Sequence, residues 1–412
     1  TMKITLGILK TTKNENPVKN EVIEGIQDNL EYFDEIIYTG SEDFFEDSDI
    51  EVKALNLDTD NKAVMRNAIL DNTSNELIMW ISDTTILEFD MIPEMLEKLE
   101  ESPDADILYP NMSVIDNEGR EKVFKLEDLY CKEKDILMSL KPENHVPEYG
   151  IITKRSIFDK FGKFDEDFKD YDFYNFLYQN LENIRLKFAE FNYVVIHYLD
   201  PFIDTSYRSY ALKKALKKYN IKDFFPKLSW DENENLAVST AYTAVGDTLS
   251  DYYDLFSASE FYRKALLSFY NKVTLLKLIK TYFNMGLFEE AKKLAKVEQG
   301  LKPEEEKTYQ EEINQAENLI KSMEEAINEG KVQEILSVIN EVTNHYQGAP
   351  LYNIIGVIEY YMKNYDNAYK FFYKAATLNP LDEDIIHNLT SVANQLGKQE
   401  DVKGLFRRVF EI

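Results

Sequence analysis

The sequence contains one cysteine, Cys131, and four histidines among its 412 residues. A disulfide framework needs paired cysteines and a cysteine-rich zinc site needs several, so this composition excludes both. A single thiol suits a reducing compartment, and we expect the protein to be cytoplasmic. We expect Cys131 itself to be an ordinary buried or half-buried thiol.

Basic residues are outnumbered by acidic ones. The chain has 47 Lys and Arg against 75 Asp and Glu, which gives a formal net charge of −28. A negative charge of this size repels nucleic-acid phosphates and anionic lipid headgroups unless a local basic patch overrides it. We therefore expect no nucleic-acid partner.

Long apolar runs are missing as well. The longest one near the N-terminus, residues 4–9, is too short for the core of a signal peptide, and no run reaches the about 18 residues of a membrane-spanning helix. With 44% hydrophobic residues, 14 Gly and 11 Pro, the chain is typical of globular proteins with large cores. We expect a soluble protein of two or three domains that does not insert into membranes.

The first half alternates apolar, strand-like runs with amphipathic, helical ones. The strand-like runs are 3–9, 35–40, 77–82 and 106–110, and the helical runs are 20–30, 62–73 and 92–102. This alternation predicts βαβ units and a mostly parallel sheet. Ligands of such sheets bind beyond the carboxyl ends of the strands, which is where Asp83 is expected to lie.

The second half has helical periodicity only and contains a repeat. Residues 349–380 have small, aromatic and proline residues at the spacings of a tetratricopeptide repeat, whose period is about 34 residues: Gly356, Ala368, Phe372, Ala375 and Pro380. Weaker units in the same frame contain Gly246, Gly286, Gly330 and Gly397. We therefore predict an α/β domain over residues 1–204, a helical junction over 205–235 and an all-α solenoid of tetratricopeptide repeats over 236–412.

Five short motifs follow one another in the first half. They are Arg66-Asn67, Ser82-Asp83-Thr84, the "GKFDE" of residues 162–166, Asp170-Tyr171-Asp172, and His197 after an apolar run. In this order the motifs resemble those of family-two glycosyltransferases, enzymes of the GT-A fold that use nucleotide-sugar donors. The resemblance covers about half of the chain, and the ordered set is more specific than any single motif. It implies a Rossmann-like GT-A domain.

The resemblance also implies roles for particular residues. Sugar transfer needs a carboxylate that takes the proton of the acceptor hydroxyl, and positive charge that stabilises the departing diphosphate. Asp170 or Asp172 is the implied general base. The residues expected to contact the donor are Thr11, Arg66, Asp83 and Arg208, the last from the basic run that follows His197.

A divalent metal ion is a further implied component. Asp83 and His197 are its implied ligands, and the pairing of oxygen with imidazole suits Mn²⁺ or Mg²⁺, with imidazole favouring Mn²⁺. The family pattern has carboxylates where this chain has Ser82 and Thr84, so metal binding stays open. In the alternative interpretation, Asp83 caps a turn and His197 is a structural residue.

Two classes of function fit these observations. The first is an inverting glycosyltransferase whose repeats recruit a protein acceptor, similar to bacterial enzymes that O-glycosylate flagellin or other surface proteins before export. The second is a GT-A domain without activity that acts as a scaffold for a repeat module. Within the enzyme class, the acceptor could instead be a glycan, with the repeats forming a homo-oligomer.

Overall fold

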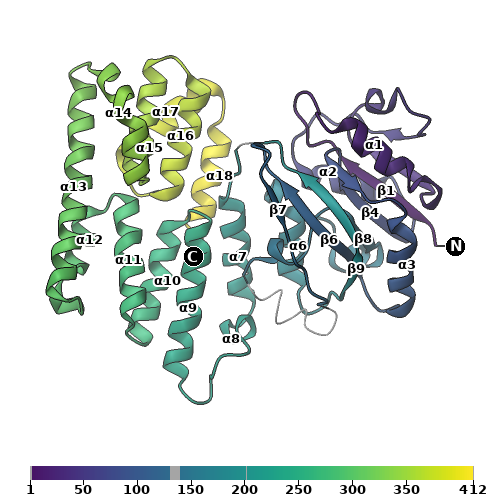
Figure 1. Cartoon of the computed structure of the whole chain (residues 1–412), viewed down its shortest axis with the longest axis horizontal. Helices are drawn as coiled ribbons and strands as arrows, with labels where there is room; N and C mark the ends of the chain where they lie inside the picture. Colours follow the sequence, from purple (N-terminus) through teal and green to yellow (C-terminus); the bar gives the residue numbers. More distant parts are fainter. Residues whose placement is uncertain (1, 130–139, 201, 412) are drawn as a thin grey trace. The chain divides into compact units, whose positions relative to one another are not determined.

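The structure is a computed structural model that describes residues 2–129, 140–200 and 202–411 (Figure 1). The chain divides into two compact units, residues 1–226 and 227–412. Cys131 lies outside the described residues, and our expectation about its thiol stays a prediction. No helix in the described ranges is long and apolar enough to cross a membrane.

The first unit is built on one large sheet. Its strands are β1 (Ile4–Leu9), β2 (Glu35–Tyr38), β3 (Lys53–Ala54), β4 (Leu77–Ser82), β5 (Thr85–Leu87), β6 (Ile107–Ile115), β7 (Glu121–Val123), β8 (Ile151–Lys154) and β9 (Leu186–His197). They are ordered β3-β2-β1-β4-β8-β6-β9-β5, and β7 pairs with β6.

This sheet is mixed, and our prediction of a mostly parallel sheet was wrong. The strands β3, β2, β1 and β4 are parallel to one another, as the alternating pattern predicts, and β6 is parallel to β9. β8 then enters antiparallel to both β4 and β6, and β5 is antiparallel to β9. The reversal occurs because Trp80 and its neighbours on β4 pair with β8, a strand about 70 residues later in the chain, and local periodicity carries no signal for such a distant pairing.

The central strands β1 and β4 are buried along their whole length. A strand that is covered on both faces needs a continuous apolar sequence, which explains the runs in this part of the chain. Gly7 of β1 provides close packing, because a Cβ atom there would lie 3.0 Å from Ile69 and 3.4 Å from Trp80. The parallel register pairs Leu9 with Ser82, so the ends of β1 and β4 meet at one edge of the sheet.

The helices α1, α2 and α3 of the first unit lie at the predicted helical runs, and further helices follow them. They are α1 (Lys19–Gln27), α2 (Lys62–Asp71), α3 (Met91–Glu101), α5 (Ser156–Phe161), α6 (Asp172–Asn180), α7 (Ser206–Lys218) and α8 (Ile221–Phe224). Short 3₁₀ helices include η2 (Glu42–Phe45), η3 (Pro142–Asn144) and η4 (Glu166–Tyr171). α7 packs against α6 and η4, within the first unit.

The second unit is helical throughout its described residues. Its helices are α9 (Glu234–Asp251), α10 (Leu255–Ser268), α11 (Lys272–Met285), α12 (Phe288–Leu294), α13 (Pro303–Asn328), α14 (Val332–His345), α15 (Ala349–Tyr361), α16 (Tyr365–Leu378), α17 (Glu383–Leu396) and α18 (Gln399–Val409). The prediction of an α/β region followed by an all-helical region is confirmed.

The small residues of the repeat pattern lie where helices approach closely. A Cβ atom on Gly246 would lie 2.5 Å from the ring of Tyr262, and one on Gly356 would lie 2.6 Å from the ring of Phe372. The helices do not follow one another in a simple row, however, because α10 also packs against α16. Ser257 of α10 donates a hydrogen bond to the carbonyl of Val409 at 3.4 Å, next to the end of the helical unit. The assignment to tetratricopeptide repeats stays a prediction.

Candidate active site

Asp83 follows β4 and ties together the ends of three strands. Its side chain is 1% exposed. One carboxylate oxygen accepts hydrogen bonds from the backbone N–H and hydroxyl of Thr11, at 3.0 and 2.9 Å, and from the hydroxyl of Thr12 at 3.1 Å. The other oxygen accepts from the hydroxyl of Tyr38, at the end of β2, at 3.1 Å. Burial raises the pKa of Asp83, and these hydrogen bonds oppose the rise.

The hydroxyls that flank Asp83 are also used within the protein. Ser82 lies 2.7 Å from the hydroxyl of Thr85, and Thr84 donates to the carbonyl oxygen of His197 at 2.6 Å. The backbone N–H of His197 in turn donates to the carbonyl of Thr84 at 3.1 Å. These contacts fix the turn between β4 and β5 against the end of β9.

The metal site implied for Asp83 and His197 does not fit these surroundings. Four hydrogen-bond donors already surround the Asp83 carboxylate. The charged groups that influence the imidazole of His197 are Glu21 and Glu121, and burial lowers its pKa. Within residues 2–129, 140–200 and 202–411, no three His, Cys, Asp or Glu side chains are grouped as metal ligands. We therefore assign no step to a metal ion.

Arg66 of α2 lies in the interior of the first unit. Its side chain is 1% exposed and forms an ion pair with Asp172, and its other terminal nitrogen lies 3.6 Å from Glu148. The guanidinium carbon lies 5.5 Å from the ring centres of both Tyr149 and Phe164. A residue enclosed in this way is placed to position other side chains, and the predicted contact of Arg66 with the donor stays a prediction.

Asn67, the next residue of α2, holds the "GKFDE" turn. Its amide group donates to the carbonyl of Phe164 at 2.9 Å and accepts from the N–H of the same residue at 3.0 Å. It also donates to Glu166 at 3.2 Å. Asn61, at the N-cap of α2, donates to the carbonyl of Glu166 at 2.9 Å. Through Asn61 and Asn67, α2 therefore holds the "GKFDE" turn and the start of η4 in place.

The two candidate bases, Asp170 and Asp172, have opposite environments. Asp172 is fully buried and ion-paired, and its second oxygen has no hydrogen-bond partner in the described part of the chain. Asp170 is exposed. It follows Lys169, whose φ of 44° and ψ of −110° interrupt η4, a conformation that is costly for a residue with a side chain. Only Asp170 is open to an incoming hydroxyl.

Charged side chains from three other segments act on Asp170. The surrounding protein raises the pKa of its carboxyl by desolvation, and Lys62 opposes this rise. Glu148 and Asp60 raise the pKa further, while Lys13 lowers it. Lys13 belongs to the loop between β1 and α1, and Lys62 to the first turn of α2, so the carboxyl edge of the sheet and α2 both contribute to the surroundings of Asp170.

Lys62, Glu148 and Tyr198 form a network that sequence reasoning missed. The ammonium of Lys62 lies 3.5 Å from one carboxylate oxygen of Glu148, and the hydroxyl of Tyr198 donates to that oxygen at 2.9 Å. Glu148 is 3% exposed, and burial would raise its pKa, but Lys62 and Arg66 outweigh burial and hold the pKa below its usual value. A signal for Lys62 existed, because it lies four residues before Arg66 on the same face of a helix.

Arg208 and Thr11 were also predicted to contact the donor. Arg208 of α7 is about one-third exposed, lies 3.8 Å from Glu143, and has its guanidinium carbon 5.7 Å from the ring centre of Tyr171. Arg208 therefore lies beside Tyr171, the residue that follows Asp170 in the chain. Thr11 lies in the loop that Asp83 anchors. The contacts of both residues with a donor stay predictions.

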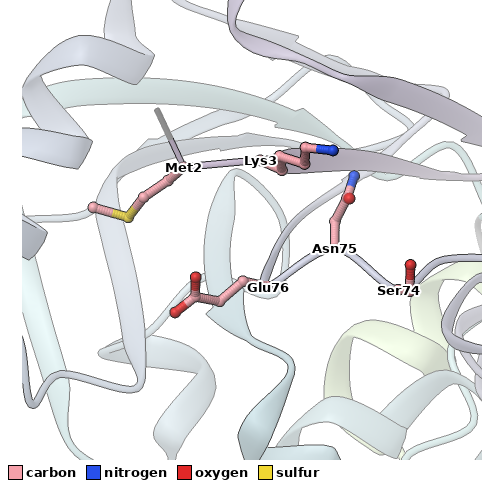
Figure 2. A pocket seen from close by; sticks show the side chains of 5 residues that line it. All are labelled: Met2, Lys3, Ser74, Asn75 and Glu76. Carbon is pink, nitrogen blue, oxygen red and sulfur yellow. The ribbon is translucent and has the colours of Figure 1, made fainter.

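A hollow of about 500 Å³ lies at the opposite edge of the sheet (Figure 2). Its lining side chains are Met2, Lys3, Ser74, Asn75 and Glu76. Because these residues precede β1 and β4, they lie at the amino ends of the two strands, away from Asp83. The hollow is therefore separate from the candidate active site.

No protein-family model and no curated protein matches this sequence. Among solved structures, S. aureus TarS 1–349 in complex with UDP-GlcNAc is similar with a TM-score of 0.45 and 12% identity, over 76% of this chain and 92% of that chain. The same fragment in complex with UDP gives a TM-score of 0.41 at 12% identity, over 65% of this chain and 89% of that chain. GalNAc-T7 with UDP, GalNAc and Mn²⁺ gives 0.38 at 12% identity, over 61% and 54%. Similarity at this level does not define a substrate, so the functional argument rests on the residues themselves.

Proposed function

We propose that this chain is a glycosyltransferase of the GT-A type that transfers a sugar from a nucleotide-sugar donor to an acceptor hydroxyl with inversion. The observation that carries the proposal is the environment of Asp170. It is an exposed carboxylate on a segment held by α2, and cations from α2 and from the loop after β1 act on it. A general base for sugar transfer needs this combination of access and ionisation.

Asp170 acts as the general base in this reaction. It accepts the proton of the acceptor hydroxyl while the hydroxyl oxygen attacks the anomeric carbon, and the bond from that carbon to the diphosphate breaks on the opposite face. Lys62 favours the ionised carboxylate, because the ammonium lowers the pKa that the surrounding protein raises. Asp172 and Arg66 act behind it as positioning residues, since they are buried and paired with each other.

The loop between β1 and α1 forms the donor side of the site. Asp83 receives the hydrogen bonds of Thr11 and Thr12 and so fixes this loop against β4. The carboxyl edge of parallel strands is the usual ligand edge of such a sheet. In this proposal Thr11 lies next to the nucleotide, and Arg208 adds positive charge from α7.

We further propose that the helical unit binds the acceptor as a tetratricopeptide domain. Close packing at Gly246 and Gly356 supports the repeat assignment. Our proposed boundaries are residues 1–204 for the transferase, 205–235 for the junction and 236–412 for the repeats. The acceptor is a protein, with flagellin or another bacterial surface protein modified in the cytoplasm as the proposed class. A glycan acceptor with self-associating repeats is the alternative within the enzyme class.

One observation favours a second function, in which the first unit is a scaffold without activity. Asp83, the one acidic residue of its motif, is occupied by four donors from the protein itself. A binding module would keep such a structural aspartate while losing turnover. The exposed Asp170 favours the enzyme over this alternative.

A nucleotide-release assay distinguishes the two functions. UDP-, GDP-, dTDP- and ADP-sugars are incubated with the full chain, with and without Mn²⁺, because water can replace the acceptor hydroxyl. The enzyme releases nucleotide from one of them, and Asp170→Asn lowers this rate by about 10²–10⁴-fold while donor affinity is kept. Asp159→Asn is the matched control, since Asp159 is 67% exposed on α5. Absence of release from every donor, with native folding verified, supports the scaffold instead.

A further inference from the structure

Among the described residues, the site has no ligand arrangement that would place a divalent cation on the departing diphosphate. The Asp83 carboxylate accepts hydrogen bonds from Thr11, Thr12 and Tyr38, so it faces protein donors on both oxygens. These donors present N–H and O–H groups, which repel a cation. If sugar transfer occurs here, another positive group has to meet the charge that develops on the diphosphate.

Lys13 is such a group. It lies in the loop between β1 and α1, directly after the two threonines that Asp83 anchors. Its ammonium is 3.3 Å from Asp200, but the two side chains are 65% and 50% exposed. An exposed ion pair of this kind is weak, and a multiply charged phosphate group in the same place competes well with it.

The position of Lys13 relative to Asp170 fits a role on the donor side. Lys13 follows Thr12, whose hydroxyl bonds to Asp83 at the carboxyl edge of the sheet, and its positive charge lowers the pKa of Asp170. It comes from the edge of the sheet, whereas Lys62, which also acts on Asp170, comes from α2 and is ion-paired with the buried Glu148. Lys62 is thus held beside the buried Glu148, whereas Lys13 is more exposed and can reach a bound substrate.

We propose that Lys13 stabilises the leaving diphosphate of the donor, in place of a divalent metal ion. This inference rests on the proposed function and deepens it. As the acceptor oxygen bonds to the anomeric carbon, the electron pair of the carbon–oxygen bond moves onto the diphosphate, and the proton of the acceptor moves to Asp170. The Lys13 ammonium leaves Asp200 and pairs with the diphosphate oxygens, as a point charge suited to phosphate. Asp83 is then the residue that positions the loop.

The test uses the full chain in excess EDTA. Nucleotide release from the donor that the wild-type chain accepts is compared for Lys13→Met, Lys13→Arg and the control Lys160→Met, whose lysine is exposed on α5. Binding is measured in parallel for the nucleoside diphosphate and for the nucleoside alone. We expect wild-type release to continue in EDTA and to be unchanged by added Mn²⁺.

Lys13→Met is expected to lower turnover by about 10–10²-fold, and Lys13→Arg to restore most of it. It should weaken binding of the nucleoside diphosphate and leave nucleoside binding unchanged, whereas a disordered loop would weaken both. Wild-type release that stops in EDTA and returns with Mn²⁺ or Mg²⁺ overturns this inference and leaves the proposed function standing. Lys13→Met with the turnover of Lys160→Met also overturns it. No release by the wild-type chain under any condition overturns the proposed function and this inference with it.

Discussion

Replacing Arg66 by methionine tests how the buried ion pair supports the candidate base. Arg66 is 1% exposed and is the cation paired with Asp172, which is fully buried. In the native protein, burial already raises the pKa of Asp172, and Arg66 opposes this rise. Without the guanidinium, desolvation and the negative charge of Glu148 outweigh the remaining positive charge of Lys62, so we expect Asp172 to take up a proton in the folded state.

The free energy needed to keep Asp172 protonated in the folded state determines how much Arg66→Met lowers the stability of the protein. The ordinary pKa of the group is 3.8. Holding it protonated costs about 1.4 kcal/mol for each pH unit above that value, which is at most about 4.5 kcal/mol at pH 7 and about 1.7 kcal/mol at pH 5. The upper figure agrees with the about 3–5 kcal/mol typical of breaking a buried pair. Because the folded pKa lies above the unfolded one, the loss of stability grows as the pH rises above 3.8.

Urea unfolding followed by tryptophan fluorescence measures this loss. The chain has two tryptophans, and in a Trp230→Phe background the buried Trp80 reports on the first unit alone. Arg120→Met is the matched control, because Arg120 is 71% exposed and solvent screens its pair with Asp116. Equal destabilisation by Arg66→Met at pH 5 and pH 7, or a loss no larger than that of the control, would refute the reasoning.

Two further predictions concern the pH profile and the helical unit. The pKa of Asp170 is raised, and the base acts when ionised, so kcat/KM should fall as the pH drops through a value above that of an ordinary aspartate; Lys62→Met should move this acid limb to higher pH. An unmoved limb in that variant argues against the role of Lys62. A chain that ends at residue 226 should keep donor hydrolysis. It should still transfer sugar to a protein acceptor, but with a higher KM for the acceptor, because the repeats no longer raise the local concentration of the acceptor at the active site. Equal efficiency of the short and full chains would show that the helices do not recruit the acceptor.

The sequence predicts the parts of the fold that local patterns determine. β1 and β4 are buried on both faces and therefore have continuous apolar runs, and α2 is capped by Asn61, whose side chain accepts from the N–H of Ala63 at 3.0 Å. The antiparallel insertion of β8 was not predicted, because pairing of Trp80 with Ile151 depends on residues far apart in the chain.

In the candidate site, too, local motifs predict some features, and contacts between distant residues determine the others. The motifs locate Asp170 and Asp172, but they do not reveal which carboxylate is exposed. That choice depends on the kink at Lys169 and on Arg66, which lies more than 100 residues earlier and has a charge partner in Asp172. Glu148 was missed for the same reason: its function as the shared partner of two cations is visible only when α2 lies beside it.

The central claim is that Asp170, as general base, promotes one direct attack on the anomeric carbon, which displaces the diphosphate with inversion. The most direct measurement is ¹H NMR of the sugar that the wild-type chain releases from its donor into water, recorded before the two anomers equilibrate. We expect the first product to have the anomeric configuration opposite to that of the donor, and its formation to be about 10²–10⁴-fold slower with Asp170→Asn. A first product with the configuration of the donor, or equal rates for the two proteins, would contradict the account.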